Sequence, residues 1–306
     1  MKRKNKKGNK ATLIVFLVII IVIAIISYFF FFKEDKIKEN GNSNNTGDVI
    51  KKEEKKELTE YEKKLEKLDN INTKINFFKA ENIDRYIAYK EKNTDVDIEK
   101  CIVYVNIGLD KEFYSDIKDS PNKNTNIVLA NKYYSLGEDY VPNNLTKIDS
   151  RYSSGDRYMQ SDATKAFNEL AQAAQKEGYT IRAVSTYRSY SYQNGLYTRY
   201  ANQDGTEKAD TYSARAGHSE HQTGLAVDVD NAKLSYTSFG NAKEFNWMKE
   251  NAYKFGFILR YTKENEWITG YKDEPWHYRY VGVEISTYIH NNPMTFEEYF
   301  VRFLDK

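Results

Sequence analysis

One uncharged apolar run near the start of the chain restricts its architecture more than any other sequence feature. Residues 11–32, ATLIVFLVIIIVIAIISYFFFF, contain no charged side chain, and a helix of this length, rising about 1.5 Å per residue, spans the hydrocarbon layer of a membrane. The run is longer than the apolar core of about 7 to 15 residues in a signal peptide, and no small-x-small cleavage site follows it. We therefore expect an uncleaved transmembrane helix, with a cleaved signal peptide as the alternative.

Basic charge is concentrated in front of this run. The first ten residues hold six of the 46 lysines and arginines and no acidic residue, so the rest of the chain carries 40 basic residues against 44 acidic ones. The positive-inside rule keeps such a tail in the cytoplasm, which predicts a cell-membrane protein whose chain after residue 33 lies on the outer, cell-wall side. Nucleic-acid binders concentrate basic charge on the folded domain instead, so we expect no nucleic-acid partner.

Composition shifts divide the chain into five expected segments. They are a basic cytoplasmic tail (1–10), the transmembrane helix (11–32), a stalk (33–70), an accessory N-terminal region (71–150) and a main domain (151–306). Residues 33–57 are rich in Lys, Glu, Asn and Gly and contain too few apolar residues to fold alone. Apolar residues then recur every three or four positions over about 51–68, which predicts a short helix in the stalk.

Cys101 is the only cysteine, so the chain forms no intrachain disulfide. Its stability must come from a hydrophobic core or a metal. The surrounding CIVYVNIGL has the alternation of a strand, and we expect Cys101 to be a buried small hydrophobe rather than a catalytic thiol.

The second half of the chain mixes helical and strand-like segments. Apolar residues at helical intervals predict a helix over 161–177, with Ser161 or Asp162 as its cap and Gly178 as its end. Further predicted elements are strands at YTIRAVSTYRS, LAVDVD, FILRY and WHYRYVG, helices near 191–202 and 241–254, a polar loop to about 217 and two short C-terminal helices. Helices and strands intermixed in this way predict an α+β domain.

Three of the four histidines belong to two short motifs: His221 and His277 lie within them, and His218 directly precedes the first. The first motif, SEHQTGLAVDV, places His221 seven residues before Asp228, with Gly224 between them. A turn at Gly224 would bring the imidazole and the carboxylate together. Asp228 lies within the apolar AVDV and should face the interior, where an unpaired carboxylate is costly unless it binds a cation. A metal ion would be that cation.

The second motif is EPWHYRYVG, with Glu274 three residues before His277. Pro275 disfavours a helix here, so we expect the pair at the entry to a strand. Two histidines and one carboxylate leave a fourth tetrahedral position for water, which is typical of catalytic rather than structural zinc. We therefore expect Zn²⁺ bound by His221, Asp228 and His277, with Glu274 free to act as the base.

These motifs resemble those of the VanY-type D-alanyl-D-alanine carboxypeptidases, which belong to the LAS metallopeptidases. The family pattern SxHxxGxAxD followed by ExxH is matched by Ser219, His221, Gly224, Ala226, Asp228, Glu274 and His277, and Trp276 matches as well. The upstream STYRSYSYQNGLY is similar to the family segment in which an arginine faces the scissile carbonyl, and Arg188 matches that arginine. The resemblance extends over about residues 80–290 in general character.

The resemblance implies an LAS-type zinc peptidase domain with a small central antiparallel sheet flanked by helices. It implies a zinc-dependent carboxypeptidase that removes the C-terminal D-alanine from peptidoglycan stem peptides or their precursors, with Glu274 as the base and Arg188 as an oxyanion donor. Substrate contacts are expected from Ser219, Gln193, Tyr187 and Ser189; for these four, as for His218, local hydrogen bonding is an equal alternative.

Other functions stay open. An L,D-carboxypeptidase or a D,D-dipeptidase would keep the same metal site with a differently shaped entrance, and the sequence does not separate these activities. An inactive cell-wall-binding module would be indicated by the loss of Glu274 or Arg188, and both residues are present.

Overall fold

The computed structural model describes residues 58–68 and 75–305. The predictions for 1–10, 11–32 and 33–57 fall outside these residues and stay predictions. Within the described ranges, no helix is both long enough and apolar enough to cross a membrane. The described residues belong to one compact unit, Leu58–Lys306.

A four-stranded antiparallel sheet forms the centre of this unit. Its strands are β5 (Arg182–Ser185), β6 (Ala226–Asp230), β8 (His277–Tyr280) and β7 (Phe257–Leu259), in that spatial order. All four lie within segments that the sequence predicts as strands. The expected mixture of helices with a small antiparallel sheet is confirmed.

Alternate side chains of β6 point to the hydrophobic core on one face of the sheet and to the candidate site on the other. Val227 and Val229 are fully buried in the main hydrophobic cluster, and because successive strand residues point to opposite faces, Asp228 between them faces the other way. The register pairs Val227 with Tyr278 and Asp228 with His277. One face of the sheet therefore contributes to the core, and the other presents Asp228 beside His277.

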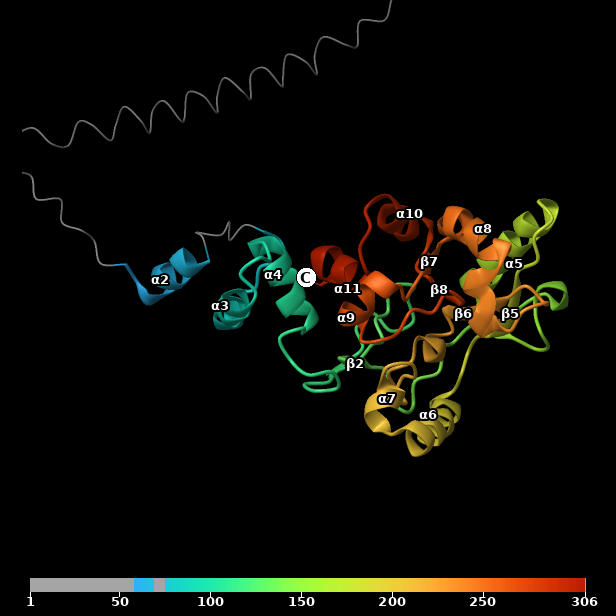
Figure 1. The fold of residues 1–306 in the computed structure, drawn as a ribbon, viewed down its shortest axis with the longest axis horizontal. Helices are drawn as coiled ribbons and strands as arrows, with labels where there is room; N and C mark the ends of the chain where they lie inside the picture. Colours follow the sequence, from blue (N-terminus) through green and yellow to red (C-terminus); the bar gives the residue numbers. More distant parts are fainter. Residues whose placement is uncertain (1–57, 69–74, 306) are drawn as a thin grey trace, which may run out of the picture. The chain divides into compact units, whose positions relative to one another are not determined.

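Helices cover the core face of the sheet. The main hydrophobic cluster joins α5 (Ser161–Lys176) and α8 (Lys243–Asn251) to the inward residues of the strands, and the Phe167 and Phe257 rings lie 6.1 Å apart between centroids. Figure 1 shows α8 and α10 (Val283–Asn291) on one side of β5 and β6, and α6 with α7 on the other. The site lies on this second side.

The predicted caps of α5, Ser161 or Asp162, are wrong, because Gln160 occupies the cap position. The helix begins at Ser161 itself, and Gln160 precedes it without a side-chain hydrogen bond to the first turn. Its predicted end is confirmed, because Gly178 follows with φ +81°.

The site-side helices are α6 (Tyr190–Asp204) and α7 (Thr206–Asp210). Ser189 caps α6 by accepting a hydrogen bond from the Tyr192 amide, so the helix predicted near 191–202 is confirmed. The segment after it was expected to be a polar loop, and α7 shows that this is wrong for five of its residues. A single short turn leaves too few residues for a periodic pattern.

The accessory region is helical where the sequence suggested a strand. It contains α3 (Ile83–Lys92) and α4 (Ile98–Ile107), preceded by α2 (Glu60–Lys67) from the predicted stalk helix. The strand prediction for CIVYVNIGL is wrong, since Asp97 caps α4 at the Lys100 amide and Gly108 ends it with φ +111°. Cys101 is fully buried, as expected.

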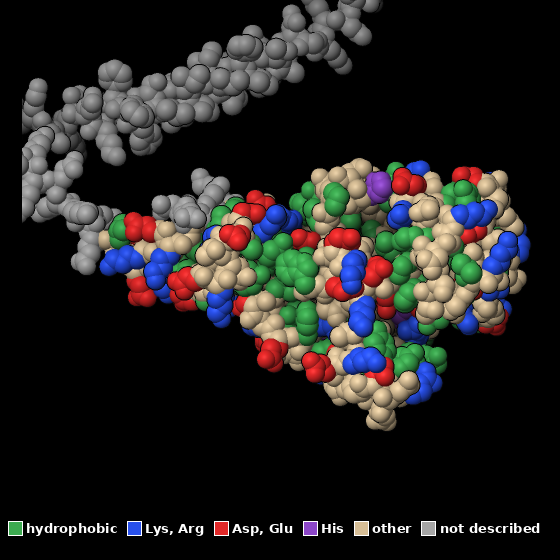
Figure 2. Space-filling model, in the orientation of Figure 1, with side chains coloured by type: hydrophobic (Ala, Val, Ile, Leu, Met, Phe, Trp, Pro, Cys, Tyr) green, Lys and Arg blue, Asp and Glu red, His purple; other side chains and the backbone are tan. Residues whose placement is uncertain are grey.

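Short elements complete the fold. They are β1 (Lys118–Asp119) paired parallel with β2 (Tyr134–Ser135), β3 (Leu145–Lys147) paired antiparallel with β4 (Tyr158–Gln160), α9 (Glu266–Thr269), α11 (Phe296–Tyr299) and several short 3₁₀ turns. Figure 2 shows basic and acidic side chains interspersed over the visible face of the described residues.

Candidate metal centre and active site

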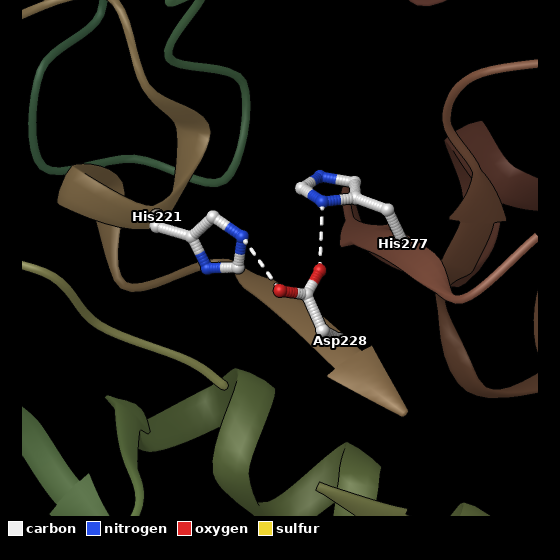
Figure 3. Close-up of side chains that lie close together, drawn as sticks. All are labelled: His221, Asp228 and His277. Carbon is white, nitrogen blue, oxygen red and sulfur yellow. Dashed lines mark hydrogen bonds and ion pairs between the residues drawn. The ribbon is translucent and has the colours of Figure 1, made fainter. Parts of the chain in front are cut away.

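Three predicted ligands converge on one point. His221 lies in the 3₁₀ turn η3 (Glu220–Thr223), Asp228 in the middle of β6 and His277 at the start of β8 (Figure 3). The Nε2 atom of His221 lies 3.3 Å from Oδ2 of Asp228, and Nδ1 of His277 lies 3.0 Å from Oδ1 of the same carboxylate. One potential ligand atom from each residue lies within 4.8 Å of the others.

A left-handed glycine makes this convergence possible. Gly224 ends η3 with φ +69°, and a Cβ there would lie 2.9 Å from the Leu145 side chain. The backbone reverses at this residue, so the chain enters β6 with His221 folded back over Asp228. This is the turn that the sequence predicted.

Ligand spacing and protonation fit a metal ion. Tetrahedral zinc with bonds of about 2.0 to 2.1 Å separates neighbouring ligand atoms by about 3.3 Å. The Nε2 atom of His221 lies 3.3 Å from Oδ2 of Asp228, which matches this spacing. The Nδ1 atom of His221 lies 2.7 Å from the Thr186 carbonyl oxygen and donates to it, which leaves Nε2 without a proton. Burial, assisted by Arg188, lowers the pKa of His221 to about 4, so its imidazole is neutral. Ligand histidines must be neutral.

The remaining two ligands show that the centre requires positive charge. Burial opposes ionisation of Asp228, but the hydrogen bond with His277 and the charge of Arg188 hold its pKa well below the usual value. Burial also lowers the pKa of His277, yet hydrogen bonds to Asp228 and Glu220 outweigh it and raise that pKa to about 9. A divalent cation bound here would supply positive charge beside these carboxylates.

Glu274 lies beside the three ligands without joining them. Its Oε2 is 3.7 Å from Nδ1 of His277, and its amide donates to the Tyr261 carbonyl just before β8. Burial raises the pKa of Glu274 to about 8, with His277 opposing the rise and Asp228 adding to it. A carboxyl group with a pKa near neutrality is suited to taking up and releasing protons.

Arg188 contacts the centre through Asp228. Its Nη2 donates to Oδ2 of Asp228 over 2.8 Å, and its Nε and Nη2 donate to the Ser185 hydroxyl over 2.9 and 2.7 Å. The guanidinium is therefore fixed in position at the edge of the metal centre.

Two neighbouring cavities meet at Arg188 and Asp228. The first, of about 380 Å³, is lined by the three ligands and Glu274 and also by Gln193 and Ser219. Tyr187 and Ser189 line the second, of about 470 Å³, rather than the first. His218 lines neither cavity; its Nδ1 lies 2.7 Å from the Asn131 carbonyl oxygen, which agrees with the local hydrogen-bonding alternative.

Glu220 is a residue of the site that sequence reasoning missed. It is fully buried, and its Oε2 lies 3.3 Å from Nε2 of His277 while its Oε1 accepts from Arg260 and Arg279. A signal was present in FILRY and WHYRYVG, where each predicted strand carries one arginine among apolar and aromatic residues. Buried arginines need carboxylate partners, and Glu220 stands next to a proposed ligand.

Comparisons with known proteins identify the relatives of this chain. Residues 156–283 match the family model described as VanY, D-alanyl-D-alanine carboxypeptidase. The "Putative carboxypeptidase YodJ" of Bacillus subtilis (strain 168) is 38% identical over 205 residues, which cover 63% of this chain and 75% of that relative.

Solved structures share the fold. The LdcB LD-carboxypeptidase, whose structure concerns peptidoglycan recognition, superposes with a TM-score of 0.58 at 38% identity, covering 63% of this chain and 92% of LdcB. A mutant of the vancomycin resistance D,D-pentapeptidase VanY, solved in complex with Zn(II), superposes with a TM-score of 0.50 at 32% identity. The match covers 57% of this chain and 98% of that chain.

The fold and the site define a peptide hydrolase of the carboxypeptidase class. Within that class, the chain belongs to the VanY family of D-alanyl-D-alanine carboxypeptidases.

Proposed function

We propose that this chain is a zinc-dependent carboxypeptidase that removes the C-terminal D-alanine from peptidoglycan stem peptides. The observation that carries the proposal is the convergence of His221, Asp228 and His277 on a cavity that Glu274 and Arg188 also line. The similar VanY mutant solved with Zn(II) supports the choice of metal, and LdcB supports a peptidoglycan substrate.

Proton transfer is assigned to Glu274. Zn²⁺ bound by the two imidazoles and Asp228 would polarise the scissile carbonyl and lower the pKa of a water molecule to about 7. Glu274 takes a proton from the attacking water and delivers it to the amine nitrogen of the leaving residue. One carbon–oxygen bond forms, the peptide carbon–nitrogen bond breaks, and one water molecule is consumed.

Arg188 is assigned to the carbonyl oxygen. Its contacts with Ser185 and Asp228 hold the guanidinium at the cavity wall before substrate arrives, so little reorganisation is needed as negative charge develops. A preorganised donor of this kind contributes about 2.7 to 4 kcal/mol to transition-state stabilisation.

Gln193 and Ser219 are assigned to the substrate in the first cavity. The Gln193 amide nitrogen donates to the Ala214 carbonyl, while its buried Oε1 has no hydrogen-bond partner among the described residues and can accept from a peptide N–H. The Ser219 hydroxyl accepts from the His221 amide and keeps its own proton to donate. Contacts from Tyr187 and Ser189 would fall in the second cavity, beyond Arg188.

An L,D-carboxypeptidase is the second candidate, because LdcB shares 38% identity with this chain and is covered over 92% of its length. Incubation with pentapeptide and tetrapeptide muropeptides, read by mass, separates the activities. Loss of one D-alanine from the pentapeptide supports the D,D activity, and loss of D-alanine from the tetrapeptide supports the L,D activity. In a parallel incubation, hydrolysis of free D-Ala-D-Ala to two alanines identifies a D,D-dipeptidase. No cleavage of either substrate by the zinc-loaded protein would overturn the proposal.

We also propose that residues 11–32 anchor the enzyme in the cell membrane with the peptidase on the wall side. The basic tail and the uncharged run support this orientation. Protease added to intact cells should cut before the folded unit and release it. Release from inside-out vesicles alone would show that the orientation is reversed.

A further inference from the structure

Glu220 is a carboxylate enclosed beside the metal centre. Its side chain is fully buried, and its Oε2 lies 3.3 Å from Nε2 of His277. It immediately precedes His221 in η3. This short turn therefore contains the proposed ligand His221 and also Glu220, which contacts the proposed ligand His277.

Two arginines fix the orientation of this carboxylate. Arg260 donates from Nε over 2.8 Å and Arg279 from Nη1 over 3.0 Å, both to Oε1 of Glu220. Both guanidinium groups are buried, so water does not compete for these bonds. With Oε1 occupied by two donors, Oε2 is directed at His277.

The same arginines connect the site to distant parts of the chain. Arg260 also pairs with Glu297 of α11, which accepts from the Asn131 side-chain amide over 3.2 Å. Arg279 donates to the Val128 carbonyl over 2.7 Å. Two buried glutamates therefore balance the charge of two buried arginines. Through these arginines, the accessory region and α11 both contact the residues around the metal centre.

The hydrogen-bond partners of the two proposed histidine ligands favour opposite tautomers for metal binding. His221 donates its Nδ1 proton to the Thr186 carbonyl, which leaves Nε2 bare towards Asp228. If Glu220 accepts the Nε2 proton of His277, Nδ1 of His277 is bare and also faces Asp228. Each imidazole then presents its unprotonated nitrogen to the same point.

We propose that Glu220 is a positioning residue of the metal centre: it accepts the Nε2 proton of His277 and holds Nδ1 ready to bind the ion. The inference rests on the zinc centre proposed above and extends it to a residue outside the ligand set. Outer partners of ligand histidines typically change metal affinity by about 10- to 100-fold when they are mutated.

Glu220→Gln tests the proposal. The arginines would hold the glutamine oxygen, so its amide NH₂ would face Nε2 of His277 and favour the tautomer that cannot bind through Nδ1. Zinc affinity of the purified full-length chain, measured by competition with a chelator, should fall by about 10- to 100-fold. The spectrum of the Co²⁺-substituted protein should change as well.

Glu297→Gln is the matched control. It removes one negative charge from the same buried network but makes no contact with His277. Both variants should lower the melting temperature of the metal-free protein, and only Glu220→Gln should weaken zinc binding. If Glu220→Gln binds zinc like wild type, or if Glu297→Gln weakens binding equally, the positioning role is wrong.

A double variant covers the case in which Glu220→Gln does not fold. Glu220→Gln with Arg279→Gln removes one charge of each sign and leaves Arg260 paired with Glu297. Zinc affinity should again be about 10- to 100-fold below wild type, and wild-type affinity in this variant would overturn the inference. Wild-type protein that binds no zinc would instead overturn the proposed function itself.

Discussion

Arg188 donates to Oδ2 of Asp228 over 2.8 Å, so the residue assigned to the substrate carbonyl also contacts a proposed metal ligand. The same Oδ2 lies 3.3 Å from Nε2 of His221. This carboxylate oxygen therefore lies beside both the arginine and a nitrogen of a proposed ligand. The effect of losing Arg188 on turnover and its effect on zinc binding can be measured separately.

Arg188→Met should lower kcat by about 100- to 1,000-fold, because it removes a preorganised donor to the developing oxyanion. Zinc content should stay near that of wild type, since all three ligands remain. Steady-state kinetics and elemental analysis measure the two quantities. Ser185→Ala is the control; it removes a hydroxyl that holds the guanidinium and should cost less activity than loss of the guanidinium itself. Unchanged kcat in Arg188→Met would exclude the oxyanion role.

Removal of the metal should abolish activity and leave the fold in place. The main hydrophobic cluster lies on the opposite face of the sheet from Asp228 and His277, so the core does not depend on the ion. We expect a chelator to lower the melting temperature, because an ion that binds only the folded state stabilises it, while the far-ultraviolet circular dichroism stays unchanged. Added Zn²⁺ should restore turnover. Full activity after exhaustive chelation would contradict a metal-dependent mechanism.

Core packing predicts a large stability effect at Phe167. Its side chain is fully buried between α5 and the sheet, so Phe167→Ala should lower the free energy of unfolding by about 3 to 5 kcal/mol. Val141→Ala, at a position 55% exposed, should change it by less than about 0.5 kcal/mol. Urea unfolding measures both. Similar values for the two variants would show that this cluster is not the core.

The sequence predicted the central strands and the ligand set because both depend on local pattern. In β6, one polar residue between two buried valines assigns Asp228 to the face opposite the core. Gly224 marks the turn that returns His221 to that face. Neither inference needs knowledge of which distant segments pack together.

Other features could not be predicted because they depend on tertiary packing. Helix α4 buries six of its ten residues and is nearly all apolar after its first turn, so it lacks the helical period that would have distinguished it from a strand. The contacts of Glu220 with Arg260 and Arg279 join residues 40 and 59 positions apart. Contacts between residues so far apart depend on the strand register, which a single sequence does not specify.

The last prediction separates the base from the ligands. Glu274 lies 3.7 Å from Nδ1 of His277 but is outside the ligand set. Glu274→Gln keeps the shape of the side chain and removes the proton acceptor, so zinc affinity should stay near wild type while turnover falls by about 100- to 10,000-fold. His277→Ala deletes a ligand and should weaken zinc binding and activity together.

Elemental analysis and steady-state kinetics on a D-Ala-D-Ala peptide distinguish the two variants. If Glu274→Gln lost zinc as completely as His277→Ala, Glu274 would be a ligand and another group would have to accept the proton. If Glu274→Gln kept both zinc and full turnover, proton transfer would not pass through this carboxylate, even with the metal centre intact. Only retained zinc with lost turnover assigns the proton to Glu274, because no ligand is removed and the buried carboxyl is the single chemical change.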